Sequence, residues 1–278
     1  MKKLMIIALV LLMAGAGFAQ TSGFDFAYRT FRGTRVVNGH SVEMHRNGEL
    51  DFLISHRFGS LNGGAYELFG LDQATIRFGL EYGLKDWINI GVGRSSYGKH
   101  YDGYLKMRFL RQAEGGSWVT LTGLSSIAIN TLRQDDYTTF ARRLSFNYQL
   151  LVARKLGEKF SIQLMPTFIH YNLVFDADAK NDLFTLGVAG KWQVTKNLGL
   201  VVEYYPKAPN ALPEVNKGAL AIGFDINTGS HVFQLHLTNT QAMIEKAFIG
   251  ETTGDWMNGD IYMGFNISRV FKLKGRRY

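Results

Sequence analysis

From Glu49 almost to the C-terminus, apolar and polar side chains alternate with a period of two. The clearest stretch runs over residues 73–83. There one face carries Ala74, Ile76, Phe78, Leu80 and Tyr82, and the other carries Thr75, Arg77, Gly79 and Glu81. Because successive side chains of a strand point to opposite faces, this period predicts half-buried β-strands and not helices.

The alternation divides into about twelve segments of roughly ten residues, which is the length that crosses a bilayer at a tilt. The predicted strands are 49–58, 73–83, 87–97, 101–111, 118–130, 141–155, 160–172, 182–194, 198–206, 218–227, 231–240 and 259–271. Pro166 falls inside one of them and predicts a bulge or a shifted boundary, because proline cannot donate a ladder hydrogen bond.

The connections between these segments alternate in length. Tight turns are expected at 84–86, 112–117, 156–159, 195–197 and 228–230, and longer loops at 59–72, 131–140, 173–181, 207–217 and 241–258. The connection 98–100 is the one exception: it is short, although its place in the order would make it one of the longer loops. In an up-and-down sheet this order places all tight turns at one end, as bacterial outer-membrane barrels do with their periplasmic turns.

These patterns predict an all-β fold, a transmembrane up-and-down antiparallel β-barrel of about twelve strands spanning residues 49–271. In hydrocarbon an unpaired backbone group has no water partner, so a membrane-spanning sheet must close. A mean hydropathy of −0.06 argues against a bundle of transmembrane helices. The absence of cysteine excludes disulfides, a cysteine nucleophile and a lipoprotein anchor.

The two ends of the chain lie outside the alternating region. Residues 1–19 resemble a secretory signal peptide, with Lys2 and Lys3 before an apolar stretch, which predicts export to the outer membrane of a Gram-negative bacterium. Residues 20–48 form an N-terminal extension, either a loose periplasmic leader or a plug whose arginines meet Glu81, Glu203 or Asp225. Residues 272–278 are expected to be a cationic periplasmic tail.

Strand parity places charges of both signs inside the predicted barrel. The inward set is Asp51, Arg57, Arg77, Glu81, Lys106, Arg108, Arg143, Lys191, Glu203 and Asp225. It is compatible with a water-filled passage that has a cationic bias, or with a lattice of cross-strand ion pairs that closes the interior. The net charge without Lys2 and Lys3 is 29 − 23 = +6 and is dispersed, so a nucleic-acid partner is not expected.

Motifs that would carry chemistry are weak. The seven histidines have no metal-ligand spacing, so neither a metal nor another cofactor is expected. Ser55 or Ser60 near His56 lacks a nucleophile elbow, and we expect no enzyme. Gly91 and Gly93 lie within a strand and predict close packing rather than phosphate binding. Residues 241–249 could form a short helix in the longest loop, either a lid over the mouth or a capping turn.

Several runs of the chain resemble an uncharacterised family of Gram-negative outer-membrane β-barrel proteins, a domain of unknown function. They are ISHRFG (54–59), FGLD (69–72), VGRSSYGKHYDGYLK (92–106), LTNTQ (237–241) and GFNISRVF (264–271). The resemblance implies location and fold but no activity. Its ionisable positions are candidates for a network in the lumen or at the mouth: His56, Arg57, Asp72, Arg94, Asp102, Lys106 and Arg269.

The sequence therefore predicts a porin-like channel or transporter for a small solute, surrounded by outer-membrane lipid. The alternatives are a closed barrel that acts as a structural element or anchors a periplasmic partner, and an outer-membrane lipid enzyme. Arg57, Arg77, Glu81, Arg94, Asp102, Lys106, Arg108, Lys191, Glu203 and Asp225 are the candidate site residues at the lumen or mouth.

Overall fold

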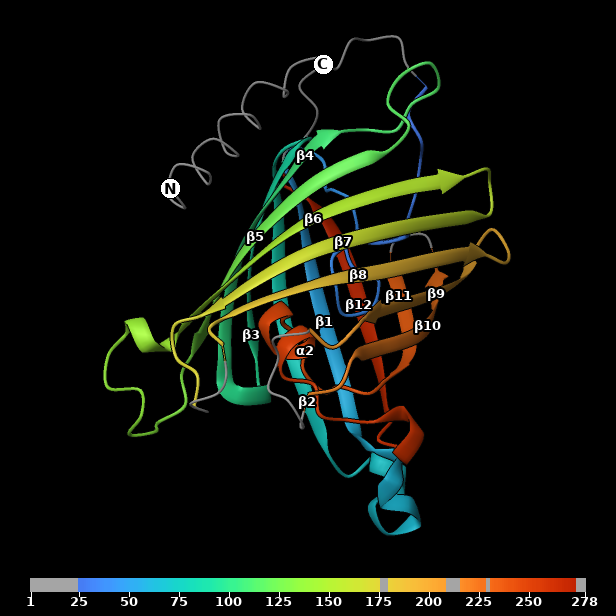
Figure 1. Cartoon of the computed structure of the whole chain (residues 1–278). Coiled ribbons are helices and arrows are strands. Elements are labelled where there is room, and N and C mark those ends of the chain that lie inside the picture. The colour runs from blue at the N-terminus through green and yellow to red at the C-terminus, as the bar shows by residue number, and fades with distance from the viewer. Residues whose placement is uncertain (1–24, 176–179, 209–215, 229–230, 274–278) are drawn as a thin grey trace.

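The computed structural model describes residues 25–175, 180–208, 216–228 and 231–273. It is a closed barrel (Figure 1). The strands are β1 Glu49–Ser60, β2 Ala74–Lys85, β3 Ile88–Ser95, β4 His100–Leu110, β5 Thr120–Asn130, β6 Leu144–Leu156, β7 Phe160–Tyr171, β8 Asp182–Gln193, β9 Leu198–Tyr205, β10 Ala219–Asn227, β11 His231–Thr238 and β12 Tyr262–Lys272. Short helices lie in the connections: η1 Leu61–Gly70, η2 Tyr97–Lys99, η3 Ala141–Arg143, α2 Glu245–Gly250 and η4 Trp256–Asn258.

Each strand pairs antiparallel with its chain neighbours, and β1 pairs with β12 to close the sheet. The closing register sets Ile54 opposite Ile267. The predicted fold class and strand count are therefore confirmed, and every strand boundary lies within three residues of its expected position. No helix in the described ranges is long and apolar enough to span a membrane.

The two faces of the sheet follow the alternation in the sequence. The outward face is apolar and exposed, and includes Phe78, Leu80, Ile90, Val92, Leu105, Ile162, Leu164, Phe184, Leu186, Val202, Ile222, Phe224, Leu235 and Leu237. The inward face is polar and buried, and includes Asp51, Arg57, Arg77, Glu81, Asp102, Lys106, Gln163, Lys191, Glu203, Asp225, Gln234 and Asn266. Apolar outside and polar inside is the arrangement of a membrane barrel.

The connections are sorted by length with one exception, because residues 96–99 form a short connection at the end where the other connections are long. Residues 86–87, 111–119, 157–159, 194–197 and 228–230 connect strands at one end, which we call the short-turn mouth. Residues 61–73, 96–99, 131–143, 172–181, 206–218 and 239–261 connect strands at the other end, the long-loop mouth. The alternation in loop length is thus a property of the folded barrel.

Pro166 lies inside β7 without a bulge, so the expected bulge or boundary shift is wrong. Gln149 pairs with Thr167 and Val152 with Leu164 in the same register on either side of it. Pro166 itself pairs with Leu186 of β8 and points outward. The sheet tolerates the missing donor because the neighbouring pairs keep the strand in place.

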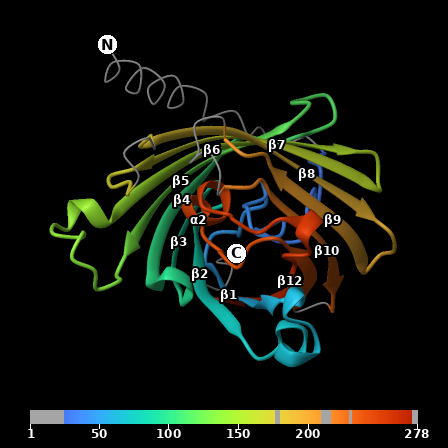
Figure 2. The ribbon, with the colours of Figure 1, turned by 60° about the horizontal axis from the view of Figure 1, so that its bottom comes forward.

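The interior of the barrel is filled by two segments that are not part of its wall (Figure 2). One is the luminal segment, residues 25–48, and the other is the loop that carries α2. Their apolar side chains share one core with the wall: Phe31, Val36, Val37 and Val42 from the luminal segment, Leu151, Met165, Val201 and Tyr205 from the wall, and Ala247, Phe248 and Ile249 from α2. The possible helix at 241–249 is observed at Glu245–Gly250, folded into the barrel.

Candidate functional site in the lumen and at the long-loop mouth

The carboxylate of Glu203 on β9 receives the backbone of the luminal segment. It accepts hydrogen bonds from the N–H groups of Val37 at 3.2 Å, Asn38 at 2.8 Å and Gly39 at 3.0 Å. Gly39 has to be a glycine because a Cβ there would lie 2.5 Å from the Tyr205 hydroxyl. Three consecutive amides around one carboxylate form an anchor that fixes both position and orientation.

Wall amides hold the backbone on both sides of this anchor. Gln163 accepts from the Val42 N–H at 2.9 Å and donates to the His40 carbonyl at 2.8 Å. Gln234 donates to the Val36 carbonyl at 2.7 Å, and Asn266 donates to that of Val37 at 2.9 Å. The buried backbone of this irregular segment is therefore paired by wall side chains, together with two backbone hydrogen bonds of its own, from Val36 to Gly39 and from Ser41 to Thr34.

Three luminal cations also contact the luminal segment. The ammonium of Lys106 donates to the Glu43 carbonyl at 2.6 Å, and that of Lys191 donates to the Arg29 carbonyl at 2.7 Å. The guanidinium of Arg57 donates to Asn38 Oδ1 at 2.8 Å. These contacts attach three of the inward cations to the luminal segment.

Two glycines of β3 make room for buried side chains of the neighbouring strands, among them an ion pair that spans β3. The guanidinium of Arg77 on β2 reaches over β3 to Asp102 on β4, with Nε and Oδ1 at 2.9 Å. A Cβ on Gly93 would collide with Arg77, and one on Gly91 would collide with the Tyr104 ring. The Tyr104 hydroxyl in turn donates to Glu81 at 3.0 Å. Close packing is thus the role of both glycines.

The remaining predicted residues make other contacts. Arg108 donates to the Asp86 carbonyl at the short-turn mouth, and Asp225 accepts from Gln234 at 2.7 Å. Arg94 is not luminal: it lies on the outer face over the Tyr101 ring, because its parity is that of the exposed Val92.

Three more positions from the resemblance are also outside the lumen. His56 stacks on Phe265 and shares the outward parity of β1. Asp72 is exposed between η1 and β2, and Arg269 lies over Phe271 near the end of β12. Sequence proximity to inward residues such as Arg57 does not bring these side chains inside, because neighbours in a strand face opposite sides.

Within the described residues no arginine of the N-terminal extension forms a salt bridge with Glu81, Glu203 or Asp225, although Arg32 is near enough to Asp225 for their charges to attract each other. Arg35 instead donates to Glu245 of α2 at 2.7 Å, with both side chains buried. His40 Nε2 lies 3.4 Å from the same carboxylate. The lumen also holds one strand-to-strand ion pair within the described residues, Arg77–Asp102, so it is not closed by the predicted lattice.

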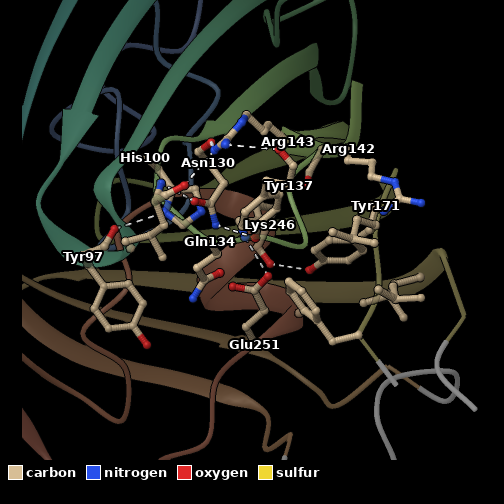
Figure 3. A pocket seen from close by; sticks show the side chains of 18 of the residues that line it. Tyr97, His100, Asn130, Gln134, Tyr137, Arg142, Arg143, Tyr171, Lys246 and Glu251 are labelled. Atoms are coloured by element: carbon tan, nitrogen blue, oxygen red, sulfur yellow. Dashed lines mark hydrogen bonds and ion pairs between the residues drawn. The ribbon is translucent and has the colours of Figure 1, made fainter. Parts of the chain in front are cut away.

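A cavity of about 830 Å³ lies at the long-loop mouth (Figure 3). Its walls come from the loops at this mouth and from the adjoining ends of β4 to β8, and α2 contributes Lys246 and Gly250. Lys246 forms an ion pair with Glu251 at 2.7 Å, and its carbonyl accepts from the Tyr171 hydroxyl at 2.6 Å. Sequence reasoning identified Arg143 as inward-facing and placed Lys246 in the possible short helix at 241–249. It did not bring these residues together with Tyr97, Tyr137 and Tyr171, because they come from distant parts of the chain.

The remaining candidates for chemistry do not assemble. Ser55 points into the lumen and His56 points outward, so the two cannot act together. Ser60 accepts from the Asn62 N–H at the start of η1. In the described ranges no three His, Asp or Glu side chains are grouped closely enough to hold a metal ion.

Comparison with known proteins places the fold. The sequence model of a family described as membrane bound beta barrel domain (DUF5777) matches residues 31–271. No curated protein matches.

Solved structures with a similar fold are outer-membrane proteins of low sequence identity. They include Omp33 of Acinetobacter baumannii (TM-score 0.46, 9% identity, 82% of this chain and 100% of that chain). The COG4313 outer membrane channel of Pseudomonas putida F1 has a TM-score of 0.46 and 13% identity, covering 82% of this chain and 97% of that chain. Escherichia coli outer membrane phospholipase A has a TM-score of 0.45 and 11% identity, covering 79% and 92%.

Proposed function

The chain belongs to the membrane bound beta barrel family DUF5777, and on that premise we propose that it is an outer-membrane transport barrel for a small solute. In this proposal the luminal segment closes the passage at rest. A solute binds first in the cavity at the long-loop mouth, and passage follows when the luminal segment shifts.

The observation that carries the proposal is the nature of the closure. The lumen is occupied by the luminal segment and by α2, two pieces that can move without opening the wall of paired strands. Most polar anchors of the luminal segment are hydrogen bonds between its backbone and individual wall side chains, such as those that Glu203 and Gln163 accept from backbone N–H groups. Such anchors can be exchanged one at a time for water.

The helix α2 connects the cavity with the closure. Lys246 and Gly250 line the cavity, and the adjacent Glu245 holds Arg35 of the luminal segment. A solute that displaces α2 would therefore act on the ion pair that fixes the luminal segment. This connection supports a gated passage over a permanently open pore.

A closed barrel that serves as a structural element or anchors a periplasmic partner is the second candidate. The observation that favours it is the apolar packing of Phe31, Val36 and Val42 against the wall, which stabilises the closed state. We propose no enzymatic activity, since Ser55 and His56 face opposite sides of β1.

The decisive experiment is planar-bilayer conductance of purified, heat-modifiable protein, compared with a variant that lacks residues 25–45. Current only after the deletion would support a gated barrel. Silence from both proteins would favour the structural barrel, and steady current from the full-length chain would overturn closure by the luminal segment. Heat modifiability of the deletion variant on gels is the control for an intact wall.

A further inference from the structure

We propose that the cavity at the long-loop mouth binds an amphipathic organic anion, whose acidic group replaces Glu251 at the ammonium of Lys246. This inference deepens the proposed function by naming the class of solute. Its test is a binding measurement that does not depend on passage through the barrel.

The ion pair between Lys246 and Glu251 is asymmetric (Figure 3). The side chain of Lys246 is only 9% exposed, whereas that of Glu251 is 39% exposed. Glu251 can turn into solvent at little cost, but Lys246 would then be a nearly buried cation without a counter-ion. An unpaired buried charge is costly. When Glu251 turns away, Lys246 therefore needs another anion, and the acidic group of a ligand can take that place.

Two further cations of the cavity have no carboxylate partner in the described chain. Arg143 donates to the carbonyls of Leu132 at 2.7 Å, Asn130 at 3.2 Å and Tyr137 at 3.3 Å. Arg142 donates to the carbonyl of Asp136 at 3.3 Å. Because carbonyl oxygens satisfy their N–H groups without neutralising their charge, both guanidinium groups add to a field that favours an anion.

The rest of the lining is suited to an apolar body. Leu132, Leu183 and Val174 line the cavity together with the aromatic rings of Tyr97, Tyr137 and Tyr171. The ammonium of Lys246 lies 5.8 Å from the centre of the Tyr171 ring, so the cationic and apolar surfaces adjoin. A volume of about 830 Å³ is within the range of cavities that take drug-sized ligands.

These features select against the other small-molecule classes. A small inorganic anion would leave the apolar lining wet, and an organic cation would meet Lys246 and both arginines. A ligand with a ring system and one carboxylate satisfies both parts of the cavity. Its carboxylate would contact Lys246, and its rings would lie against the tyrosines and Leu132.

The test is isothermal titration of the full-length protein in zwitterionic nanodiscs with three naphthalene probes. They are 2-naphthoate, 2-naphthalenemethanol and 2-naphthylmethylamine, which share a ring system and differ in charge. We expect 2-naphthoate to bind at least about tenfold more tightly than the other two, a difference that corresponds to about 1.4 kcal/mol. Equal binding of the alcohol, tighter binding of the amine or no binding of any probe would overturn the proposal.

Two substitutions separate the proposal from a general loss of structure. Lys246→Gln should weaken 2-naphthoate binding about tenfold or more, whereas Glu251→Gln should strengthen it severalfold by removing the competing carboxylate. Lys217→Gln is the matched control, because Lys217 is a lysine in an ion pair with Asp255 outside the cavity. Weaker binding in Glu251→Gln would overturn the exchange even if Lys246→Gln failed to fold.

Failure of this inference is distinguishable from failure of the transport proposal. A protein that binds 2-naphthoate with this charge preference but shows no current after deletion of residues 25–45 would keep the anion site and lose transport. A protein that conducts after the deletion but does not discriminate among the probes would keep transport and lose the anion site.

Discussion

The guanidinium of Arg35 donates to the carboxylate of Glu245 at 2.7 Å inside the barrel, although 210 positions separate the two residues in the chain. Arg35 belongs to the luminal segment and Glu245 to the loop that folds in from the long-loop mouth. Both side chains are buried, and their ion pair joins the luminal segment to the loop that carries α2. A second polar contact between the two segments is that of His40 Nε2 with the same carboxylate, at 3.4 Å.

Removing one partner of this pair should release the luminal segment. Arg35→Ala leaves the Glu245 carboxylate buried without its cation, which should cost the docked state about 3–5 kcal/mol. Because the chain has no cysteine, Val42→Cys supplies a single buried reporter on the luminal segment. Its rate of reaction with a water-soluble thiol reagent should rise strongly in the Arg35→Ala background. The double variant Arg35→Ala/Glu245→Ala should recover part of the loss, and an unchanged rate in Arg35→Ala would contradict the role of the pair.

Gly39→Ala should weaken the Glu203 anchor. The new Cβ would lie 2.5 Å from the Tyr205 hydroxyl, so the backbone must move away from the carboxylate. Loss of hydrogen bonds to a charged group predicts a cost of about 1.5–3 kcal/mol, read as faster thiol labelling of Val42→Cys. Gly33→Ala is the matched control, since its Cβ would meet no atom closer than 3.9 Å. Equal labelling of both alanine variants would show that the close approach of Gly39 does not matter.

Gly93→Ala should break the Arg77–Asp102 ion pair and lower barrel stability. The added methyl group would collide with the Arg77 guanidinium and would lie 2.8 Å from Asp102 Oδ1. Disruption of a buried pair predicts a loss of about 3 kcal/mol, measured by urea unfolding in lipid vesicles. Gly103→Ala on the adjacent strand, with no contact closer than 3.8 Å, should unfold like the wild type. A stable Gly93→Ala protein would mean that Arg77 has another low-energy position.

Docking of the luminal segment should weaken at alkaline pH through His45. Burial lowers the pKa of His45, but the Asp51 carboxylate, 3.2 Å from His45 Nε2, and the nearby Glu81 outweigh it and raise the pKa above 6.5. A pKa raised in the docked state gives stability that is complete below about pH 6.5 and is lost as the pH rises through the docked value. Thiol labelling of Val42→Cys, corrected for the ionisation of the thiol, should accelerate over that range, and His45→Gln should abolish the acceleration.

His40 should produce the opposite limb of the same pH profile. Burial and then the charges of Arg35, Lys106 and Arg77 hold the pKa of His40 well below 6.5. The docked state therefore prefers neutral His40, and its contribution is complete above about pH 6.5 and is lost as the pH falls below that value. His40→Gln should remove the acid limb without changing the alkaline limb. A profile in which one substitution removes both limbs would contradict this assignment.

Leu186→Arg should destabilise the barrel in a bilayer. Leu186 is exposed on the outward face in the middle of β8, where lipid tails would surround it. A cation at the midplane predicts a cost of about 2–4 kcal/mol, against about 0–1 kcal/mol near the interface. Tyr204→Arg, near the end of β9, is the control for the interface position. Equal costs in urea unfolding from vesicles would contradict a membrane band centred on Leu186.

The sequence by itself determined the barrel. The period of two fixes which residues of each strand face each side, and the order of tight turns and long loops fixes how the strands run. Both are local properties, and the membrane then leaves closure as the only way to pair the edges of β1 and β12. The inward positions of Arg77, Glu81 and Lys106 followed from parity alone.

Only the tertiary structure decided what fills the barrel and which partners its charges take. Glu203 binds backbone amides of Asn38 and its neighbours, about 165 positions away, and a backbone N–H leaves no signature in the sequence. Arg35 pairs with Glu245 because two irregular segments meet in the lumen. Neither segment has a periodic sequence pattern from which its position in the barrel could be predicted. The cavity around Lys246 is likewise assembled from strand ends and loops that come together only in the closed wall. Periodicity specifies the faces of a strand, but contacts between aperiodic segments arise only when the whole chain is folded.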